Sequence, residues 1–278
     1  EALQTNTTGS SNAAFGSKSL NKNTVGNNNT AVGDSTMFAN TTGSFNTALG
    51  KAALSLNTTG SSNVAIGRTA LLTNTTGSNN TAIGNGANVS SGALSNATAL
   101  GFGATANASN KVRIGGSTVT VIEGQVAYTF PSDARFKNEI KDNVPGLDFI
   151  TKLKPVTYKF DTKKFDMHLM QNMPEEIKAA KLKEENYTES SNIIHSGFLA
   201  QDIEKICKEL GYDFDGLHIP TDATDNYSVA YSQFIMPLVK GMQEQQSIIE
   251  QQKQKMELQT LELEILKKQM QEILLLPN

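Results

Sequence analysis

The first hundred residues keep a 17-residue repeat without slippage. Each repeat has a glycine that directly follows a larger apolar residue and stands two residues after an alanine. These glycines are Gly16, Gly33, Gly50, Gly67, Gly84 and Gly101. A second marker keeps the same step: NTTG begins at Asn6, Asn40, Asn57 and Asn74, and NTVG begins at Asn23. A fixed period indicates stacked, similar coils, so the repeat predicts a rod and not the core of a globular enzyme.

Each repeat contains two short apolar runs separated by residues that favour turns. Glycine and asparagine adopt positive φ angles at low cost, so NTTG and the glycine after the apolar residue predict corners. Two short strands and two corners make one coil of a parallel β-roll, or β-solenoid, which we expect over residues 1–115.

One such coil buries little apolar surface. Its interior is expected to hold one larger apolar residue, alanines, and a Leu or Met at Leu20, Met37, Leu54 and Leu71. At roughly 25 cal/mol per Å² this is small against a backbone entropy of about 1–2 kcal/mol per residue. The coils therefore need lateral partners, and a homotrimer would supply a shared axial core. A monomeric β-helix is the alternative.

Composition narrows the functional classes. Only six charged residues lie within residues 1–110, which argues against electrostatic capture of nucleic acid. The single cysteine, Cys207, excludes an internal disulfide, and no apolar run approaches the roughly 20 residues that cross a bilayer. The chain starts at Glu1 without a methionine or signal-like segment, which we interpret as a fragment or a processed product.

The repeat over about residues 5–105 resembles the head repeats of trimeric bacterial adhesins and the collar-like regions of phage tail fibres. The resemblance implies a parallel β-roll in which three chains wind side by side. It says little about a ligand, because many such rods are spacers.

The C-terminal segment shows the apolar spacing of a coiled coil, which we expect over residues 235–276 with its end at Pro277. The a positions are Ile235, Met242, Ile249, Met256, Leu263 and Met270. The d positions are Leu238, Gln245, Gln252, Gln259, Leu266 and Ile273. The glutamines cost stability but can fix the register. An amphipathic helix folded back on its own domain is the alternative, which the glutamines and the helix length disfavour.

Between rod and coil the composition changes. Residues 116–131 alternate like exposed strands and predict a β transition. Residues 132–234 predict a small α+β domain. Helices are expected at 144–153, 174–185 and 200–210, the last ending at Gly211, and strands at 155–160 and 193–199.

The α+β region opens with SDARFKNEI. From the residues alone, Ser132 or Asp133 is a helix N-cap, and Arg135 pairs with Glu139 four residues on. A serine and a lysine five apart are most often structural. On a regular helix they point about 140° apart, so a Ser132–Lys137 dyad needs a bend or a partner subunit.

This stretch resembles the S-D-x-R-x-K signature that opens the intramolecular chaperone domain of phage endosialidases, tailspikes and tail fibres. The resemblance continues through GLDFITKLKPVTYKF at 146–160, GFLAQDIEKI at 197–206 and YSQFIMPLVKGMQEQQ at 231–246. The second block carries the chaperone signature residues Gly197, Phe198, Ala200 and Gln201.

In that family the chaperone trimerises, guides the upstream fibre into register and cuts itself off before the serine. The resemblance therefore implies Ser132 as nucleophile, Lys137 as base, Arg135 as the charged neighbour and Asp133 as part of the signature. The scissile bond would be Pro131–Ser132. A lysine amine acts as a base only when neutral, which burial or a nearby cation favours, so we expect trimer closure to control a single cut.

Other residues suggest no chemistry. The three histidines, His168, His195 and His218, lack metal-ligand spacing, and the acidic run 213–225 lacks a calcium-loop pattern. Met167, Met170 and Met173 are expected in a loop or as core filler, and Cys207 as a small buried residue. We expect no metal and no cofactor.

The sequence thus predicts a homotrimeric fibre whose chaperone releases itself, on a virion or a cell surface. A host-surface receptor, glycan or protein, is a possible further partner through the rod or an upstream tip; nucleic acid and membrane insertion are not expected. An adhesin-like rod with an uncut, permanent trimerisation cap is the alternative, and a glycan-cleaving enzyme is the third reading. Phage and bacterial origins both stay open.

Overall fold

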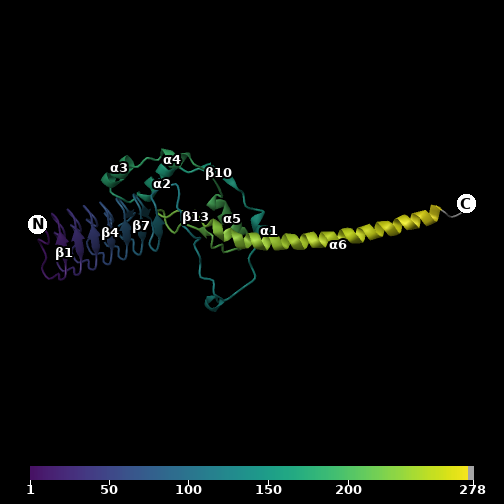
Figure 1. Ribbon diagram of the computed structural model, residues 1–278, viewed down its shortest axis with the longest axis horizontal. Helices are drawn as coiled ribbons and strands as arrows, with labels where there is room; N and C mark the ends of the chain where they lie inside the picture. Colours follow the sequence, from purple (N-terminus) through teal and green to yellow (C-terminus); the bar gives the residue numbers. More distant parts are fainter. Residues whose placement is uncertain (275–278) are drawn as a thin grey trace. The chain divides into compact units, whose positions relative to one another are not determined.

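The computed structural model describes residues 1–274 and divides into two compact units (Figure 1). The first unit comprises residues 1–127, 157–195 and 220–226. The second comprises residues 128–156 and 196–219 together with the chain from Tyr227 onward. The domain borders expected at residues 115, 131 and 234 remain predictions.

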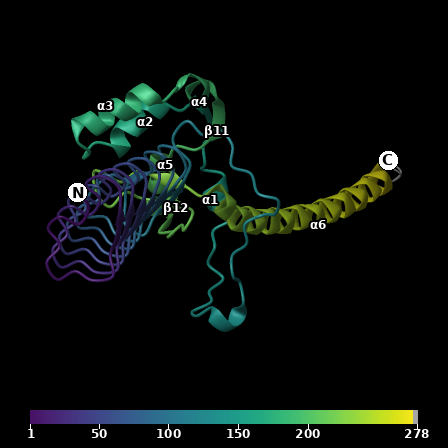
Figure 2. The same ribbon diagram turned by 60° about the vertical axis from the view of Figure 1, so that its left-hand side comes forward.

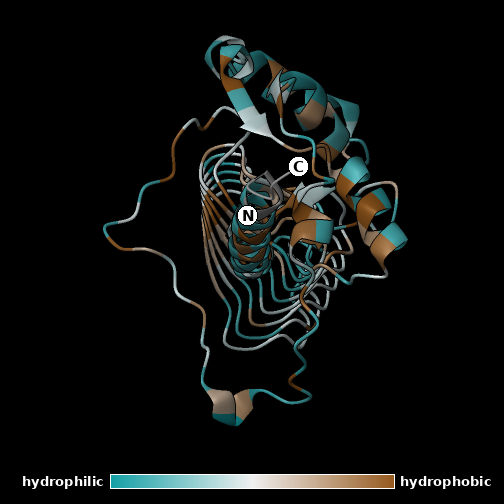
Figure 3. Cartoon of the chain, turned by 90° about the vertical axis from the view of Figure 1, so that its right-hand side faces the viewer, coloured by the Kyte–Doolittle hydropathy of each residue, from teal (hydrophilic) through white to brown (hydrophobic). Residues whose placement is uncertain are grey.

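The first unit contains the predicted β-solenoid, in which one three-residue strand per coil joins a seven-stranded parallel sheet. Its strands are β1 (Ala13–Phe15), β2 (Thr30–Val32), β3 (Thr47–Leu49), β4 (Val64–Ile66), β5 (Thr81–Ile83), β7 (Thr98–Leu100) and β9 (Val112–Ile114). Up to β7, residues 17 apart pair directly, so the 17-residue period is confirmed. Figure 3 shows the coils lying over one another.

The expected second strand per coil is largely wrong. A second pairing occurs only between β6 (Asn88–Val89) and β8 (Thr105–Ala106). In the other coils, turns and bends connect successive strands. Backbone hydrogen bonds between neighbouring coils, such as that from Leu54 N–H to the Ala70 carbonyl at 2.8 Å, occur there together with asparagine side-chain bonds.

Fewer apolar side chains are buried inside the solenoid than predicted. The central alanine of β2 to β5 is fully buried, and so are Leu20, Met37, Leu54 and Leu71, as expected. The larger residue before each glycine does not join them: Phe15 is 78% exposed and Leu49 is 49% exposed. Side chains alternate along a strand, so an inward alanine places its neighbour outside.

Two ladders of asparagine amides run along the solenoid, and all their members after the first of each ladder are buried. In the first, each Nδ2 donates to Oδ1 of the asparagine one coil earlier at 2.8–2.9 Å and to a glycine carbonyl three residues on at 2.9–3.0 Å. In the second, each Oδ1 accepts from the backbone N–H and Nδ2 of the next asparagine at 2.9–3.2 Å. The first ladder comprises Asn6, Asn23, Asn40, Asn57 and Asn74, and the second Asn12, Asn29, Asn46 and Asn63.

The glycines of the two markers serve different purposes. The glycines of the 17-residue series take φ angles of +112° to +134°, as predicted for corners. The NTTG glycines do not have positive φ. A Cβ on Gly60 would lie within 2.5 Å of the Gly77 carbonyl oxygen and of Asn57 Oδ1, so glycine there permits close stacking of the coils.

The rest of the first unit is a helical insert that lies beside the solenoid (Figure 2). It contains α2 (Thr162–Leu169), α3 (Glu175–Glu184) and α4 (Thr188–Asn192). The helix at α3 is confirmed, whereas α2 and α4 were not predicted. Strands β10 (Val156–Lys159) and β11 (Ile194–Gly197) pair with each other where they were expected.

The predicted β transition at residues 116–131 is wrong. These residues form no strand in the single chain, and residues 119–143 are all exposed. Their apolar alternation has no neighbouring strand or core to pack against.

The second unit is a small helical core with a long C-terminal helix. It comprises α1 (Leu147–Ile150), α5 (Ala200–Leu210), the short hairpin of β12 (Leu217–His218) and β13 (Ser228–Val229), and α6 (Ile235–Leu274). Two short 3₁₀ helices, η1 (Ala134–Phe136) and η2 (Tyr231–Phe234), complete it. The buried cluster is Phe149, Ile203, Ile206, Cys207, Phe214 and Phe234.

Several predictions for this unit are confirmed. Gly211 ends α5 in the left-handed conformation, and Cys207 is buried. This burial raises the pKa of the Cys207 thiol. Helix α6 is continuous over 40 residues, as the heptads predicted. The expected end at Pro277 lies outside the described residues.

We predict that Asn57→Asp strongly destabilises the solenoid. The aspartate keeps the shape but loses the Nδ2 donor, which leaves Asn40 Oδ1 unpaired, removes one of the two donors to the Gly60 carbonyl and buries a charge. Each unpaired buried group costs about 1–3 kcal/mol. Thermal unfolding measures the loss, with exposed Asn28→Asp as the matched control; equal effects of the two substitutions would refute the ladder's role.

We predict that Glu185→Gln stabilises the protein at neutral pH. Glu185 Oε1 is buried without a hydrogen-bond partner, and burial raises the pKa of this carboxyl above 4.5. A raised folded-state pKa stabilises the fold below pH 4.5 and loses that contribution as pH rises through the folded value. The gain in unfolding temperature should therefore vanish in acid, whereas exposed Glu189→Gln should change little at either pH.

Candidate functional site

The SDARFK segment forms a single tight turn that its own side chains stabilise. Asp133 is the N-cap of η1, and its Oδ1 accepts the Arg135 backbone N–H at 2.9 Å. The predicted N-cap at Asp133 is therefore confirmed, although the helix is one 3₁₀ turn long. Lys137 follows in an extended conformation, with φ −103° and ψ 124°.

This break in the helix brings the predicted pair together. Lys137 Nζ donates a hydrogen bond to Ser132 Oγ at 2.7 Å. A regular helix would hold the two side chains apart, whereas a 3₁₀ turn followed by an extended residue returns the lysine to the serine. The segment therefore contains the bend that a dyad requires.

Arg135 does not pair with Glu139, and that prediction is wrong. Its guanidinium binds Asp133 with contacts of 2.6 Å, 2.9 Å and 3.1 Å, and it lies over the Phe136 ring at 5.6 Å. The Arg135 hydrogen bonds lower the pKa of Asp133, and the same contact raises the pKa of Arg135. Glu139 would lie beside Arg135 only on a continuous helix, and the helix here ends at Phe136. The planar guanidinium therefore binds the carboxylate of Asp133, which lies two residues away.

The pairing of Arg135 affects the surroundings of Lys137. The guanidinium of Arg135 was expected to favour the neutral form of the Lys137 amine. Its charge is already neutralised by the Asp133 carboxylate. Ser132 and Lys137 are also both exposed, so burial does not supply that effect in the single chain. The Ser132 hydroxyl and the Lys137 amine are in contact, but in the single chain they lack the water-excluding surroundings that favour a neutral lysine base.

Large apolar side chains flank this polar turn in the sequence and are open to water. Each of them is at least 74% exposed: Val126, Tyr128, Phe130, Phe136 and Ile140. Exposed aromatic and aliphatic residues at this density are typical of a surface that another chain covers.

The chaperone signature residues belong to the second unit, in which Gln201 is exposed and Phe198 and Ala200 are half-buried. Gly197 ends β11 and is buried, while Phe198 packs on Phe234 and donates its backbone N–H to Tyr231 Oη at 3.0 Å. Ala200 and Gln201 open α5. Among the described residues, no hydrogen bond or ion pair joins this group to Ser132–Lys137.

The predicted coiled-coil residues share one exposed seam on α6. The a positions Ile235, Met242, Ile249, Met256, Leu263 and Met270 are 49–70% exposed. The two leucines at d positions, Leu238 and Leu266, are 47% and 55% exposed. In the single chain, the apolar side chains of this seam have no partner helix to pack against.

The remaining candidates have structural surroundings. His195 stacks on Tyr158, and His168 Nε2 lies 3.1 Å from the Asp225 carbonyl oxygen. Met170 and Met173 are buried as predicted, whereas Met167 is exposed. No cluster of metal-ligating residues and no helix suited to a bilayer occurs within residues 1–274.

One polar cluster was not predicted from the sequence. Asp166 is fully buried and binds Lys181 Nζ at 3.3 Å and the Tyr187 hydroxyl at 2.8 Å. Arg113 stands close enough for Asp166 to oppose the lowering of the Arg113 pKa by burial. Burial likewise lowers the pKa of Lys181, and burial with the Asp166 bond raises that of Tyr187. The partners come from distant parts of the sequence, so no spacing signals them.

Residues 132–212 match the protein family described as chaperone of endosialidase. No curated protein and no solved structure matched the chain in the same comparisons. The matched region begins at Ser132 and covers less than a third of the chain, downstream of the solenoid. A β-solenoid followed by a region similar to this chaperone family suggests a phage-fibre-like protein.

Proposed function

We propose that this chain is the subunit of a homotrimeric fibre whose C-terminal chaperone directs trimer assembly and then cuts itself off between Pro131 and Ser132. The observation that carries the proposal is the 2.7 Å contact between Lys137 Nζ and Ser132 Oγ at the first residue of the family match. A serine hydroxyl in contact with a lysine amine can act as a nucleophile when that amine is neutral and takes its proton.

The cut proceeds through the chain's own atoms. A neutral Lys137 takes the hydroxyl proton of Ser132, and Oγ attacks the carbonyl carbon of Pro131. The Ser132 nitrogen leaves with the proton that Lys137 returns, which converts the peptide bond to an ester on Ser132. Water then hydrolyses the ester, leaving a carboxylate on Pro131 and a free amine and hydroxyl on Ser132. The chain is its own substrate, so each molecule reacts once.

Exposed apolar faces support a trimer. The outward residue beside each corner glycine forms a column along the solenoid, with Leu49, Ile66, Ile83 and Leu100 each 36–49% exposed. A second unfilled surface is the α6 seam, and a third is the set of apolar residues that flank Ser132. Neighbouring copies of the chain would cover all three with like residues, as in a parallel, symmetric assembly.

The same packing accounts for the timing of the cut. In the single chain Lys137 is exposed, and Asp133 neutralises Arg135. Partner chains that pack on Phe130, Phe136 and Ile140 would exclude water from the turn and favour the neutral amine. Cleavage would then follow assembly and never precede it.

The proposed fibre belongs to a phage tail or a similar virion or cell-surface appendage. Its rod, or a tip upstream of it, would contact a glycan or protein receptor on the host. The composition supports this assignment, because a polar, nearly uncharged rod binds little by non-specific electrostatics.

An uncut rod with a permanent trimerisation cap is the second candidate. The observation that favours it is the open, solvated Ser132–Lys137 contact, which lacks both burial and an unpaired cation. It predicts an intact trimer of the same architecture.

Intact masses of the purified protein test the proposal. The wild-type chain should yield pieces that end at Pro131 and begin at Ser132, and Ser132→Ala and Lys137→Ala should each abolish them. Lys141→Ala, an exposed lysine in the same segment, is the matched control and should cleave normally. An intact wild-type trimer would replace the proposal with the uncut cap.

The same masses test the coupling to assembly. The double substitution Ile249→Lys and Met256→Lys places charges in the α6 seam far along the sequence from the cut. We expect a monomer that stays intact. A monomer that cleaves at the wild-type rate would show that trimer closure does not control the reaction.

A further inference from the structure

The first unit joins segments from both sides of the proposed cut. Residues 157–195 and 220–226, which follow Ser132, share this unit with the solenoid, which precedes it. We call them the docking segments. The chain between the solenoid and these segments is exposed throughout residues 119–143, so the contacts described next do not depend on it.

The first contact is a buried lysine that crosses from the insert to the solenoid. Lys181 Nζ donates to the Gly103 carbonyl oxygen at 2.7 Å and to Thr105 Oγ1 at 3.3 Å. Asp166 neutralises the lysine from the insert side, and the Lys181 side chain is only 12% exposed. A buried ion pair with this many hydrogen bonds has a defined geometry that water does not replace.

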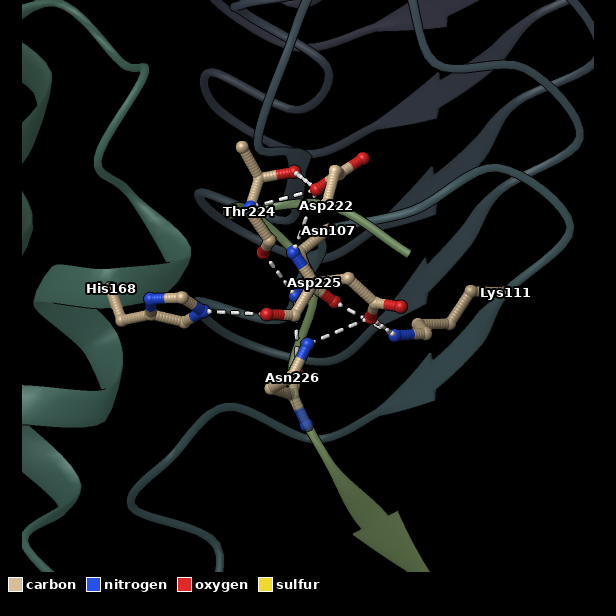
Figure 4. A network of polar contacts seen from close by, with 7 residues as sticks. All are labelled: Asn107, Lys111, His168, Asp222, Thr224, Asp225 and Asn226. Atoms are coloured by element: carbon tan, nitrogen blue, oxygen red, sulfur yellow. Dashed lines mark hydrogen bonds and ion pairs between the residues drawn. The ribbon is translucent and has the colours of Figure 1, made fainter. Parts of the chain in front are cut away.

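The second contact holds the loop at residues 220–226 on the last coil (Figure 4). Lys111 Nζ binds Asp225 Oδ1 at 2.7 Å, and that carboxylate is 3% exposed. Asn107 Nδ2 donates to the Thr224 carbonyl at 2.8 Å and to Asn226 Oδ1 at 3.1 Å. His168 of α2 reaches the Asp225 backbone from the other side.

Apolar side chains line a hollow beside the Lys181 site. Leu72 and Phe102 of the solenoid line one hollow together with Met173, Ile177 and Ala180 of the insert. Arg68 and Glu184 form an exposed ion pair at its edge, which contributes little by itself. The solenoid end thus offers two buried polar sites and an apolar hollow next to the first of them.

We propose that the C-terminal piece remains bound to the solenoid after the cut, as a non-covalent cap on its last coils. The proposal rests on the proposed cleavage for its role in the fibre, but the docking surface does not depend on that reaction. The occupant is the docking segments of this same chain. Breaking Pro131–Ser132 removes none of the contacts at Gly103, Lys111 or Asn107.

A cap has a physical purpose at this place. Strand β9 is the last strand of the parallel sheet, and an uncovered edge invites pairing with other chains. Solenoids need a terminal element that ends the stack. The docking segments contact the coil that contains β9 through Lys111, and Arg113 of β9 lies over the Phe165 ring at 5.1 Å.

The test nicks the full chain with an added protease. A recognition sequence for a site-specific protease replaces residues 122–127, which are all exposed, in a Ser132→Ala background. After the nick, size-exclusion chromatography with mass detection shows whether the two pieces elute together. Because the added protease makes the nick, the result is independent of self-cleavage and of the fate of the proposed function.

We expect the two pieces to elute together at neutral pH and moderate salt. Lys111→Ala with Lys181→Met should weaken their association by at least about 100-fold, because two buried carboxylates lose their cations. The matched control is Lys51→Ala with Lys183→Met, which replaces an exposed lysine on each side of the surface and should leave the pieces together.

Two results would overturn the proposal. The first is that the pieces of the unsubstituted chain separate after the nick. The second is that the pieces of the Lys111→Ala, Lys181→Met variant elute together to the same extent as those of the control variant. Circular dichroism before the nick reports whether the substituted chain folds. If the doubly substituted chain does not fold, the single variant Lys111→Ala serves as the test, because this solenoid side chain lies outside the insert's own fold. If its pieces then elute together as those of Lys51→Ala do, the proposal is overturned.

Discussion

The architecture depends on asparagine amides that are buried inside the solenoid. Each amide binds the same amide one coil away, so its hydrogen bonds are complete only when every coil has the same length. A coil of a different length would leave buried donors and acceptors unpaired, which is costly in a low-dielectric interior. This requirement explains why the repeat keeps 17 residues through successive coils.

The same ladders leave little room for a hydrophobic core. The space between the amides accepts alanine and one Leu or Met per coil, and the larger apolar residues stay outside. Those outward residues, the α6 seam and the apolar residues that flank Ser132 are three separate surfaces that a single chain leaves open. The polar interior is therefore the physical reason for our proposal that neighbouring copies of the chain cover these surfaces.

The sequence predicted what depends on local pattern. The period gave the solenoid, the heptads gave α6, and Gly211 gave the end of α5. The sequence pattern placed the NTTG motif at corners but did not reveal that Asn57 faces inward. Asparagine is favoured both in turns and in a buried amide ladder, so its presence does not distinguish the two. The pattern also put the apolar residue of each repeat inside, since composition does not say which of two adjacent side chains points in.

The candidate site shows the same division. Ser132 and Lys137 are close enough in sequence for one broken turn to bring them together, and the need for a bend was foreseeable. The choice of Asp133 over Glu139 by Arg135 depended on where the short helix stops. The Asp166 cluster and the Lys111–Asp225 contact join residues up to 114 positions apart, so only the tertiary structure could reveal them.

The mass of the folded chain in solution tests the central claim most directly. Multi-angle light scattering on Ser132→Ala, which keeps the chaperone attached, should give three times the chain mass of 29.9 kDa. A stable monomer at micromolar concentration would contradict the account, because three exposed apolar surfaces would then have no partner.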